Sequence, residues 1–282
     1  MSWRLADKKD LDLLLPFLLR EEWRSVVLSA LFRKLDGASF PPYHETQVHL
    51  LCRGKEIRGL LAVTSTGLLL PLLEKGPAAE GFALRANRSS LHSIMGTAQD
   101  VLWMEGCLPL KPSRAVDYHL MVLSREDHSL VDKPPLEPAP GLCIRSAGQA
   151  DLQALFPLQK SYELEEVVLE PGHFSGRACL ANLKRALRSQ VVMLAELEGR
   201  VVAKAGTNAR GFQTDQIGGV YTLGEERKRG FSFRVLEALL ERLFREKRTV
   251  SLFVKKTNLP ALRLYQKLGF STADSYRISY FF

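Results

Sequence analysis

The sequence has little cysteine and no long apolar run. Its 282 residues include only four cysteines, and no two of them form a C-x-x-C pair. The spacing indicates neither a zinc site nor a disulfide framework, so we expect reduced thiols in the core at Cys52, Cys107, Cys143 and Cys179. No apolar stretch approaches the roughly 20 residues of a membrane helix, and residues 1–10 lack the form of a secretory signal. We therefore expect a cytoplasmic protein that binds no metal and no membrane.

The chain does carry an excess of positive charge. Lys and Arg number 39 against 31 Asp and Glu, which gives a net charge of +8. Such a charge suits either nucleic acid or an anionic cofactor. No zinc-finger, helix-turn-helix or RNP-type pattern accompanies it, and the basic residues are spread along both halves of the chain. The sequence therefore favours an anionic cofactor, and nucleic-acid binding is the alternative.

A proline-rich stretch divides the chain into two halves. Pro134, Pro135, Pro138 and Pro140 lie within seven residues of one another. Proline at that density favours an extended linker over a helix or a central strand. The predicted division is an N-terminal domain at 1–130, a linker at 131–141 and a C-terminal domain at 142–282.

Both halves mix helices with strands. In the first half, the patterns predict strands at 47–52, 57–65, 68–73 and 117–124, and helices at 7–16, at 21–35 and from Ser89 or Ser90 to 104. We expect Pro16 to break or kink the first helix. In the second half, they predict strands at 142–145, 191–197, 200–208, 249–254 and 276–280, and helices at 151–165 and 173–188. The fold class is therefore α+β.

The second half is organised around residues 217–232. They predict a strand, a basic turn with Gly230, and a helix whose apolar residues recur from Phe231 to Phe244. A helix start offers N–H groups without internal partners, together with the positive end of the helix dipole. Such a start is a ready site for phosphate oxygens, and Arg227, Lys228 and Arg229 add positive charge.

Two motifs resemble a known family. Residues 227–232 read Arg-Lys-Arg-Gly-Phe-Ser and resemble the Q/R-x-x-G-x-G/A pyrophosphate loop of the GCN5-related N-acetyltransferase (GNAT) superfamily, with Ser232 where Gly or Ala is usual. Residues 258–270 are similar to the N-x-x-A-x-x-L-Y-x-K-x-G-F pattern near the end of GNAT domains. Asn258, Ala261, Leu264, Tyr265, Lys267, Gly269 and Phe270 fill that pattern. The resemblance covers residues 142–282 and implies a GNAT fold, in which helices flank a twisted, mostly antiparallel sheet.

The resemblance also implies a cosubstrate, acetyl-CoA, and residues that bind it. Its pyrophosphate would lie on the loop formed by Arg227, Lys228, Arg229, Gly230, Phe231 and Ser232. Its pantetheine arm would pair with the backbone of Val220, Tyr221 and Thr222 as an added strand. Asn258 would hold this arm or an ordered water.

The same resemblance implies catalytic roles. Tyr265 would act as the general acid that protonates the departing thiolate. Asn258 and Tyr265 are seven residues apart, so they lie on one face of a helix. Glu165 and Glu166 are candidates for the group that deprotonates the acceptor amine. The alternative for these two glutamates is a solvated acidic helix end.

The first half shows a similar order of elements but lacks the cofactor loop. Gly81 and Ala83 match the loop pattern in part, whereas Ala78 stands where Arg or Gln is expected and Glu80 would repel phosphate. We interpret this half as a degenerate GNAT-like copy that binds no coenzyme A, as in tandem members of the superfamily. The alternative is an unrelated small α+β domain.

These observations predict an N-acetyltransferase that moves an acetyl group from acetyl-CoA to a primary amine. Attack would be direct, in a ternary complex, because no cysteine is placed to carry the acyl group. The alternative is a non-catalytic acyl-CoA sensor. The sequence leaves the acceptor amine open.

Overall fold

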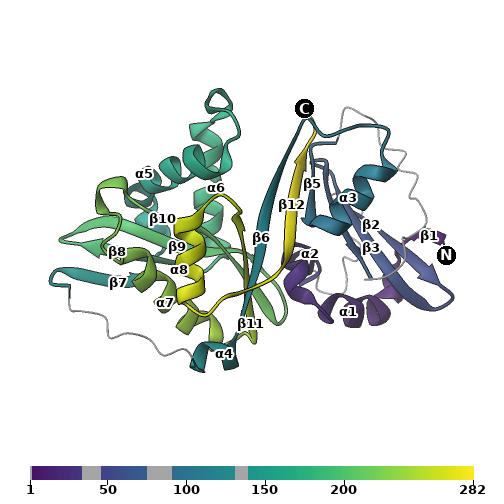
Figure 1. Cartoon of the computed structure of the whole chain (residues 1–282), viewed down its shortest axis with the longest axis horizontal. Helices are drawn as coiled ribbons and strands as arrows, with labels where there is room; N and C mark the ends of the chain where they lie inside the picture. Colours follow the sequence, from purple (N-terminus) through teal and green to yellow (C-terminus); the bar gives the residue numbers. More distant parts are fainter. Residues whose placement is uncertain (1, 34–45, 75–90, 131–138) are drawn as a thin grey trace.

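The two halves of the chain share one sheet. The computed structural model describes residues 2–33, 46–74, 91–130 and 139–282. Within these residues, twelve strands form a single mixed sheet in the order β1-β2-β3-β4-β5-β12-β6-β11-β10-β9-β8-β7. Only two neighbouring pairs of described strands, β4–β5 and β10–β11, are parallel, and helices lie on both sides (Figure 1). The predicted α+β fold with a mostly antiparallel sheet is confirmed.

The first half begins with short helices and an antiparallel meander. Its elements are β1 (Ser2–Leu5), α1 (Leu11–Leu19), α2 (Val26–Arg33), β2 (Thr46–Arg53), β3 (Glu56–Thr64), β4 (Leu68–Leu73), β5 (Ser93–Thr97), α3 (Ala98–Cys107), β6 (Arg114–Ser124) and α4 (Arg125–Leu130). The meander forms where alternation predicts it. Gly54 and Gly67 make its turns with φ of +61° and +76°, which a residue with a Cβ rarely adopts.

The second half repeats this plan. Its elements are β7 (Leu142–Ser146), α5 (Leu152–Tyr162), α6 (Gly176–Ser189), β8 (Val192–Leu197), β9 (Arg200–Arg210), β10 (Thr214–Thr222), α7 (Phe231–Phe244), β11 (Thr249–Lys255), α8 (Leu259–Lys267) and β12 (Ser271–Tyr280). Each half thus begins with a strand, two helices and three strands. A fifth strand, parallel to the fourth, then follows, and a helix and a last strand complete the half. The counterpart of α7 in the first half would fall at residues 75–90, which lie outside the described residues, as do Ala78, Glu80, Gly81 and Ala83.

Several sequence predictions for the first half were wrong in detail. The helix predicted from Ser89 or Ser90 is preceded by a strand, β5, and begins at Ala98 because Thr97 caps it, accepting from the Asp100 backbone N–H. Pro16 does not end α1, which continues to Leu19. All four cysteines are free, but only Cys179 is buried in the core, and Cys143 is exposed.

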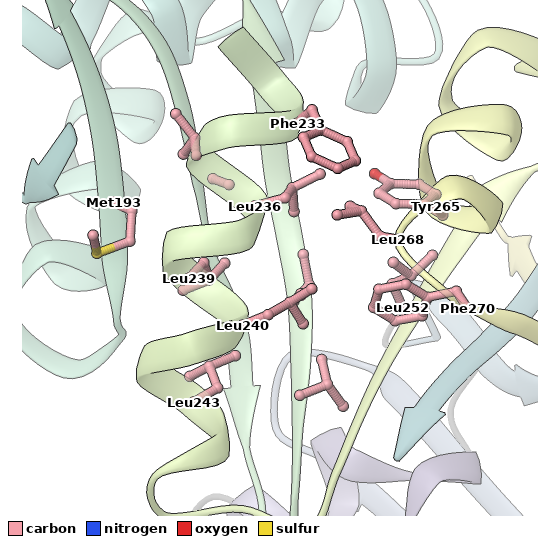
Figure 2. Packing of buried hydrophobic residues seen from close by; sticks show 14 of the residues in the cluster. Met193, Phe233, Leu236, Leu239, Leu240, Leu243, Leu252, Tyr265, Leu268 and Phe270 are labelled. Carbon is pink, nitrogen blue, oxygen red and sulfur yellow. The ribbon is translucent and has the colours of Figure 1, made fainter. Parts of the chain in front are cut away.

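Helices cover both faces of each half of the sheet. On β8, Val192 and Leu194 pack with α5 and α6, whereas Met193 packs with α7 on the opposite face. Successive side chains of a strand point to opposite faces, so one apolar run serves two cores. The larger core surrounds α7, whose leucines lie between Met193 on one side and Tyr265, Leu268 and Phe270 on the other (Figure 2). Each fully buried leucine of α7 contributes about 1.5–3 kcal/mol.

The last strands of the two halves are exchanged in the sheet. β6, from the first half, pairs with β11 over seven residues, Tyr118 to Ser124, and β12, from the second half, pairs with β5. The two exchanged strands also pair with each other and run side by side through the middle of the molecule (Figure 1). The boundary of the halves in sequence stays a prediction, and most of the linker, 131–138, lies outside the described residues. In space, each half completes the sheet of the other.

A buried carboxylate adds a second link between the halves. Glu22, which follows α1, is only 3% exposed. Its two oxygens accept the backbone N–H groups of Phe212, Gln213 and Thr214 in the β9–β10 turn, at 2.7–2.8 Å. Three charge-assisted hydrogen bonds thus fix this turn of the second half to the first half.

Candidate functional site

The two parallel strands of the second half separate and open a cavity. β10 pairs with β11 only through Thr214, Asp215 and Gln216, so the remaining residues of β10 leave that edge without a described partner strand. A cavity of about 750 Å³ lies at this opening. Its lining includes most of the predicted site residues, namely Glu165, Glu166, Val220, Tyr221, Thr222, Arg227, Lys228, Gly230, Phe231, Ser232, Asn258 and Tyr265.

The start of α7 forms one end of the cavity. Gly230 precedes the helix with φ of +80°, and Lys228 also has a positive φ of 65°. A Cβ on Gly230 would meet nothing within 4 Å, so open space adjoins the backbone here. The first N–H groups of the helix have no intrahelical partners and carry the positive end of its dipole. This end of the cavity therefore suits an anion such as a pyrophosphate.

Three side chains of the loop take different positions. Arg227 lines the cavity, and its Nε donates to the Thr222 carbonyl oxygen at 3.3 Å. Ser232 shares a 2.6 Å hydrogen bond with the Thr222 hydroxyl, which ties the helix start to the end of β10. Arg229, predicted to bind the cofactor, is not among the lining residues and is paired with Glu226.

Helix α8 and its N-cap bring Tyr265 and Asn258 to the same cavity. Asn258 caps the helix, since its Oδ1 accepts from the Ala261 N–H at 3.2 Å. Tyr265 is 8% exposed, and its hydroxyl is directed toward Phe233 of α7 (Figure 2). Burial raises the pKa of Tyr265 above its usual range, and the nearby Tyr162 and Glu166 raise it further. The phenol therefore carries its proton at neutral pH.

The two glutamates after α5 have distinct partners. They lie in a π-helical turn, Glu163–Val167, that extends α5. Glu165 accepts from the Tyr221 hydroxyl at 2.5 Å and from Arg227 at 2.7 Å. Burial raises the pKa of Glu165, but these two hydrogen bonds and the Arg227 charge outweigh it and lower the pKa. Glu165 is therefore a weak base that ties this turn to the cofactor loop.

Glu166 lies deeper along the same wall. One of its oxygens accepts from Asn258 Nδ2 at 3.2 Å, and the other is 3.2 Å from Lys255 Nζ. Its side chain is 33% exposed and lines the cavity. The two glutamates are thus adjacent in sequence, but Glu166 contacts the N-cap residue of α8, whereas Glu165 contacts Arg227 of the cofactor loop.

A buried lysine shapes β10 beside the cavity. Between Gly218 and Tyr221 the strand has a bulge, where Gly219 adopts φ of +65°. Lys204 of β9 is only 4% exposed and donates to the Gly219 carbonyl oxygen at 2.8 Å. Its Nζ also lies 4.9 Å from the ring centre of Tyr162. Lys204 therefore holds the Gly219 peptide while it packs against the Tyr162 ring.

Burial perturbs the ionisation of both side chains. Desolvation lowers the pKa of Lys204 to about 8, against the opposing influence of Glu163 and Cys179. Desolvation likewise raises the pKa of Tyr162 to about 12. Strongly perturbed groups beside a cavity often mark functional sites.

Sequence reasoning missed several residues of this cavity. They include Tyr118, Tyr162, Asn208, Phe253, Lys255, Ile278 and Tyr280 in the lining, and Lys204 behind it. Lys204 could have been noticed, because it is a single lysine among apolar residues of a strand. A lysine in such a place is buried only where its ammonium has a partner. The tyrosines gave none, because aromatic residues are common in any strand. Among the described residues, no group of three or more His, Cys, Asp and Glu could hold a metal ion.

Comparison with solved structures identifies the fold. A Drosophila protein is similar over 99% of this chain and 98% of its own, with a TM-score of 0.70 and 14% identity. A tandem GNAT protein from the clavulanic acid biosynthesis pathway is similar over 98% and 97%, with a TM-score of 0.57 and 15% identity. A GNAT-family acetyltransferase from Colwellia psychrerythraea is similar over 100% of both chains, with a TM-score of 0.55 and 14% identity. The chain therefore has a tandem GNAT fold.

The sequence comparison agrees for the second half. Residues 155–270 match the model of the acetyltransferase (GNAT) family. The match confirms the resemblance to the GNAT family that residues 227–232 and 258–270 predict. No curated protein matches the sequence. None of the helices in the described ranges is long and apolar enough to cross a membrane.

Proposed function

We propose that the protein transfers an acetyl group from acetyl-CoA to a primary amine by direct attack in a ternary complex. One observation carries the proposal: an anion-binding helix start, a free strand edge, and a buried tyrosine with an asparagine all border one cavity. The family match over residues 155–270 supports the acetyl group as the cargo. Residues 142–282 would form the catalytic domain, and 1–130 the degenerate copy.

The cosubstrate would extend from α7 to α8. Its pyrophosphate oxygens would accept hydrogen bonds from the backbone N–H groups at the start of α7, with Lys228 and Arg227 nearby. Its pantetheine arm would run along Val220, Tyr221 and Thr222, whose edge has no described partner strand. Lys204 would act as a positioning residue, because it fixes the peptide of Gly219 in the bulge at that edge.

The chemistry needs a base and an acid. Of the two predicted carboxylates, we favour Glu166 as the base that takes the amine proton, directly or through water, because it contacts Asn258 at the α8 side of the cavity, whereas Glu165 is tied to the cofactor loop by Tyr221 and Arg227. Tyr265 would donate its proton to the departing thiolate. An ordinary phenol is a weaker acid than a thiol, with pKa values near ~10 and ~8.5. Burial in the cavity disfavours both the phenolate and the thiolate. It therefore raises the pKa of the thiol as well as that of the phenol, and the departing thiolate becomes a stronger base.

The direct test follows thiol release and product together. The full chain is mixed with acetyl-CoA and a panel of primary amines, free thiol is followed by colour, and acetylated amine by mass spectrometry. We expect equal amounts of thiol and acetylamine, both abolished when the amine is left out. Coenzyme A binding without turnover on any amine would contradict the proposal and favour the non-catalytic acyl-CoA sensor. The cytoplasmic location and the lack of a metal stay predictions from the sequence.

A further inference from the structure

The far end of the cavity, away from the start of α7, has an aromatic wall. Tyr118 of β6, Phe253 of β11 and Tyr280 of β12 line it. Tyr118 and Tyr276 are opposite each other in the register of β6 and β12, and Tyr118 also faces Lys255 of β11. The three strands therefore present these side chains on one face of the sheet. Leu252 and Val254, which alternate with Phe253, belong to the core around α7.

The rings of this wall support one another. Phe253 meets Tyr118 edge to face at 5.1 Å and stacks on Tyr276 at 4.8 Å, with an angle of 4° between the planes. Rings held in this way keep their faces and edges in fixed places. A ligand ring packed against them would gain aromatic contacts without ordering flexible side chains.

The glutamates that line the cavity, Glu165, Glu166 and Glu226, already have basic partners. Glu166 is engaged by Lys255 and Asn258, and Glu165 by Arg227 and Tyr221. A polycationic acceptor would need several carboxylates that lack partners, and this wall supplies rings instead. A single amine could reach Glu166, which borders both the aromatic wall and Asn258.

We propose that the acceptor is a primary amine carried on an aromatic body, and that β6 of the first half supplies part of its binding wall through Tyr118. The inference rests on the proposed function and names its substrate class. The amine nitrogen forms the C–N bond to the acetyl carbonyl carbon while the C–S bond breaks. The sulfur leaves with the bonding electrons and takes a proton from Tyr265, and the nitrogen gives a proton to Glu166. The products are an N-acetylated amine that carries the aromatic group and free coenzyme A.

The test compares amines that differ in size, aromaticity and charge on the full chain. The probes are phenethylamine, 2-cyclohexylethylamine, n-butylamine and spermidine, each with saturating acetyl-CoA. We expect kcat/KM for phenethylamine to exceed that for n-butylamine by about tenfold or more, because the ring fills an apolar pocket. It should exceed that for cyclohexylethylamine by about two- to tenfold, because only the aromatic ring gains the ring contacts. Phenylalanine is a further probe, and shows whether an aromatic amine with a carboxylate is also accepted.

Two variants of Tyr280 test whether its ring gives the preference for phenethylamine over n-butylamine. Tyr280→Ala should reduce the ratio of phenethylamine to n-butylamine, whereas Tyr280→Phe, which keeps the ring, should retain it. Turnover of n-butylamine or spermidine as efficient as that of phenethylamine would overturn the aromatic acceptor and leave the acetyltransferase proposal standing. No turnover with any amine would overturn both. If Tyr280→Ala fails to fold, the wild-type panel and Tyr280→Phe still decide.

Discussion

Replacing Lys204 with Met should change the pH dependence of stability in a defined way. Lys204 is 4% exposed, donates to the Gly219 carbonyl oxygen at 2.8 Å and has a pKa lowered to about 8 by desolvation. Its ammonium therefore costs the folded state free energy that the unfolded chain does not spend. Methionine has a similar length and no charge. The variant removes the titration while keeping most of the packing of the lysine stem.

The size of the effect follows from the two pKa values of the lysine. The difference between its ordinary value of 10.5 and about 8 corresponds to about 3 kcal/mol, at about 1.36 kcal/mol per pKa unit. Below pH 8 both states are protonated and the full cost is present. As pH rises from 8 to 10.5 the folded protein releases its proton first, so the wild type gains stability relative to the variant. The gain should be about 1.4 kcal/mol at pH 9.

The assay is urea denaturation of wild type and Lys204→Met from pH 7 to pH 10. The lost hydrogen bond to Gly219 shifts the whole difference curve by a constant, of about 1–3 kcal/mol, and leaves its slope unchanged. The same substitution at the exposed Lys184 is the control for a lost surface charge. A difference between wild type and Lys204→Met that stays flat from pH 7 to pH 10 would refute the burial of a protonated lysine.

Four further changes test the site and the fold. Tyr265→Phe should lower kcat by about 10²- to 10⁴-fold and leave coenzyme A affinity nearly unchanged, and an activity within twofold of wild type would remove Tyr265 as the acid. Gly230→Val should weaken coenzyme A binding about tenfold or more in calorimetry, because φ of +80° strains any side chain and the Cβ enters the open space beside the helix start. Gly224→Val, also in open space but without a positive φ, is its control. Glu22→Gln should destabilise the protein by about 2–4 kcal/mol in urea, because one of three backbone N–H groups would face an NH₂ group; Glu56→Gln, on an exposed side chain, should change stability little. A fragment of residues 142–282 should not unfold cooperatively as a monomer, because β11 and β12 lose the strand between them, and a cooperative, monomeric fragment would contradict the role given to β6.

Local signals account for the parts of the fold that the sequence predicts well. Asn258 as a cap, Pro260 in the first turn and Gly269 after the last turn identify α8 almost to the residue, and Gly269 indeed has φ of +93°. Such signals work because capping and turn geometry depend on a few neighbouring residues. β5 was missed for a related reason. Ser93 to Thr97 precede a helix directly, and only the cap at Thr97 separates the strand from the helix.

Long-range pairing explains what the sequence does not predict. The sequence predicts β6 and β12 as ordinary strands at the ends of their halves. Their alternation of apolar and polar residues does not indicate which strand each one pairs with. The cavity likewise has one part that local sequence predicts and another that depends on long-range pairing. Its cofactor end follows a local motif around Gly230, whereas Lys204, Tyr118 and Tyr280 reach it from strands far apart in sequence.

The strand exchange gives the first half a place in the site. Had each half kept its own last strand, Tyr118 would lie in the sheet of the first half, beside β5. Because β6 lies between β11 and β12, Tyr118 instead faces Lys255 and meets Phe253 at the edge of the second half's cavity. If the proposed acceptor site is correct, a half without a recognisable cofactor loop takes part in substrate binding. Its removal would take away a central strand of the sheet together with a wall of the cavity.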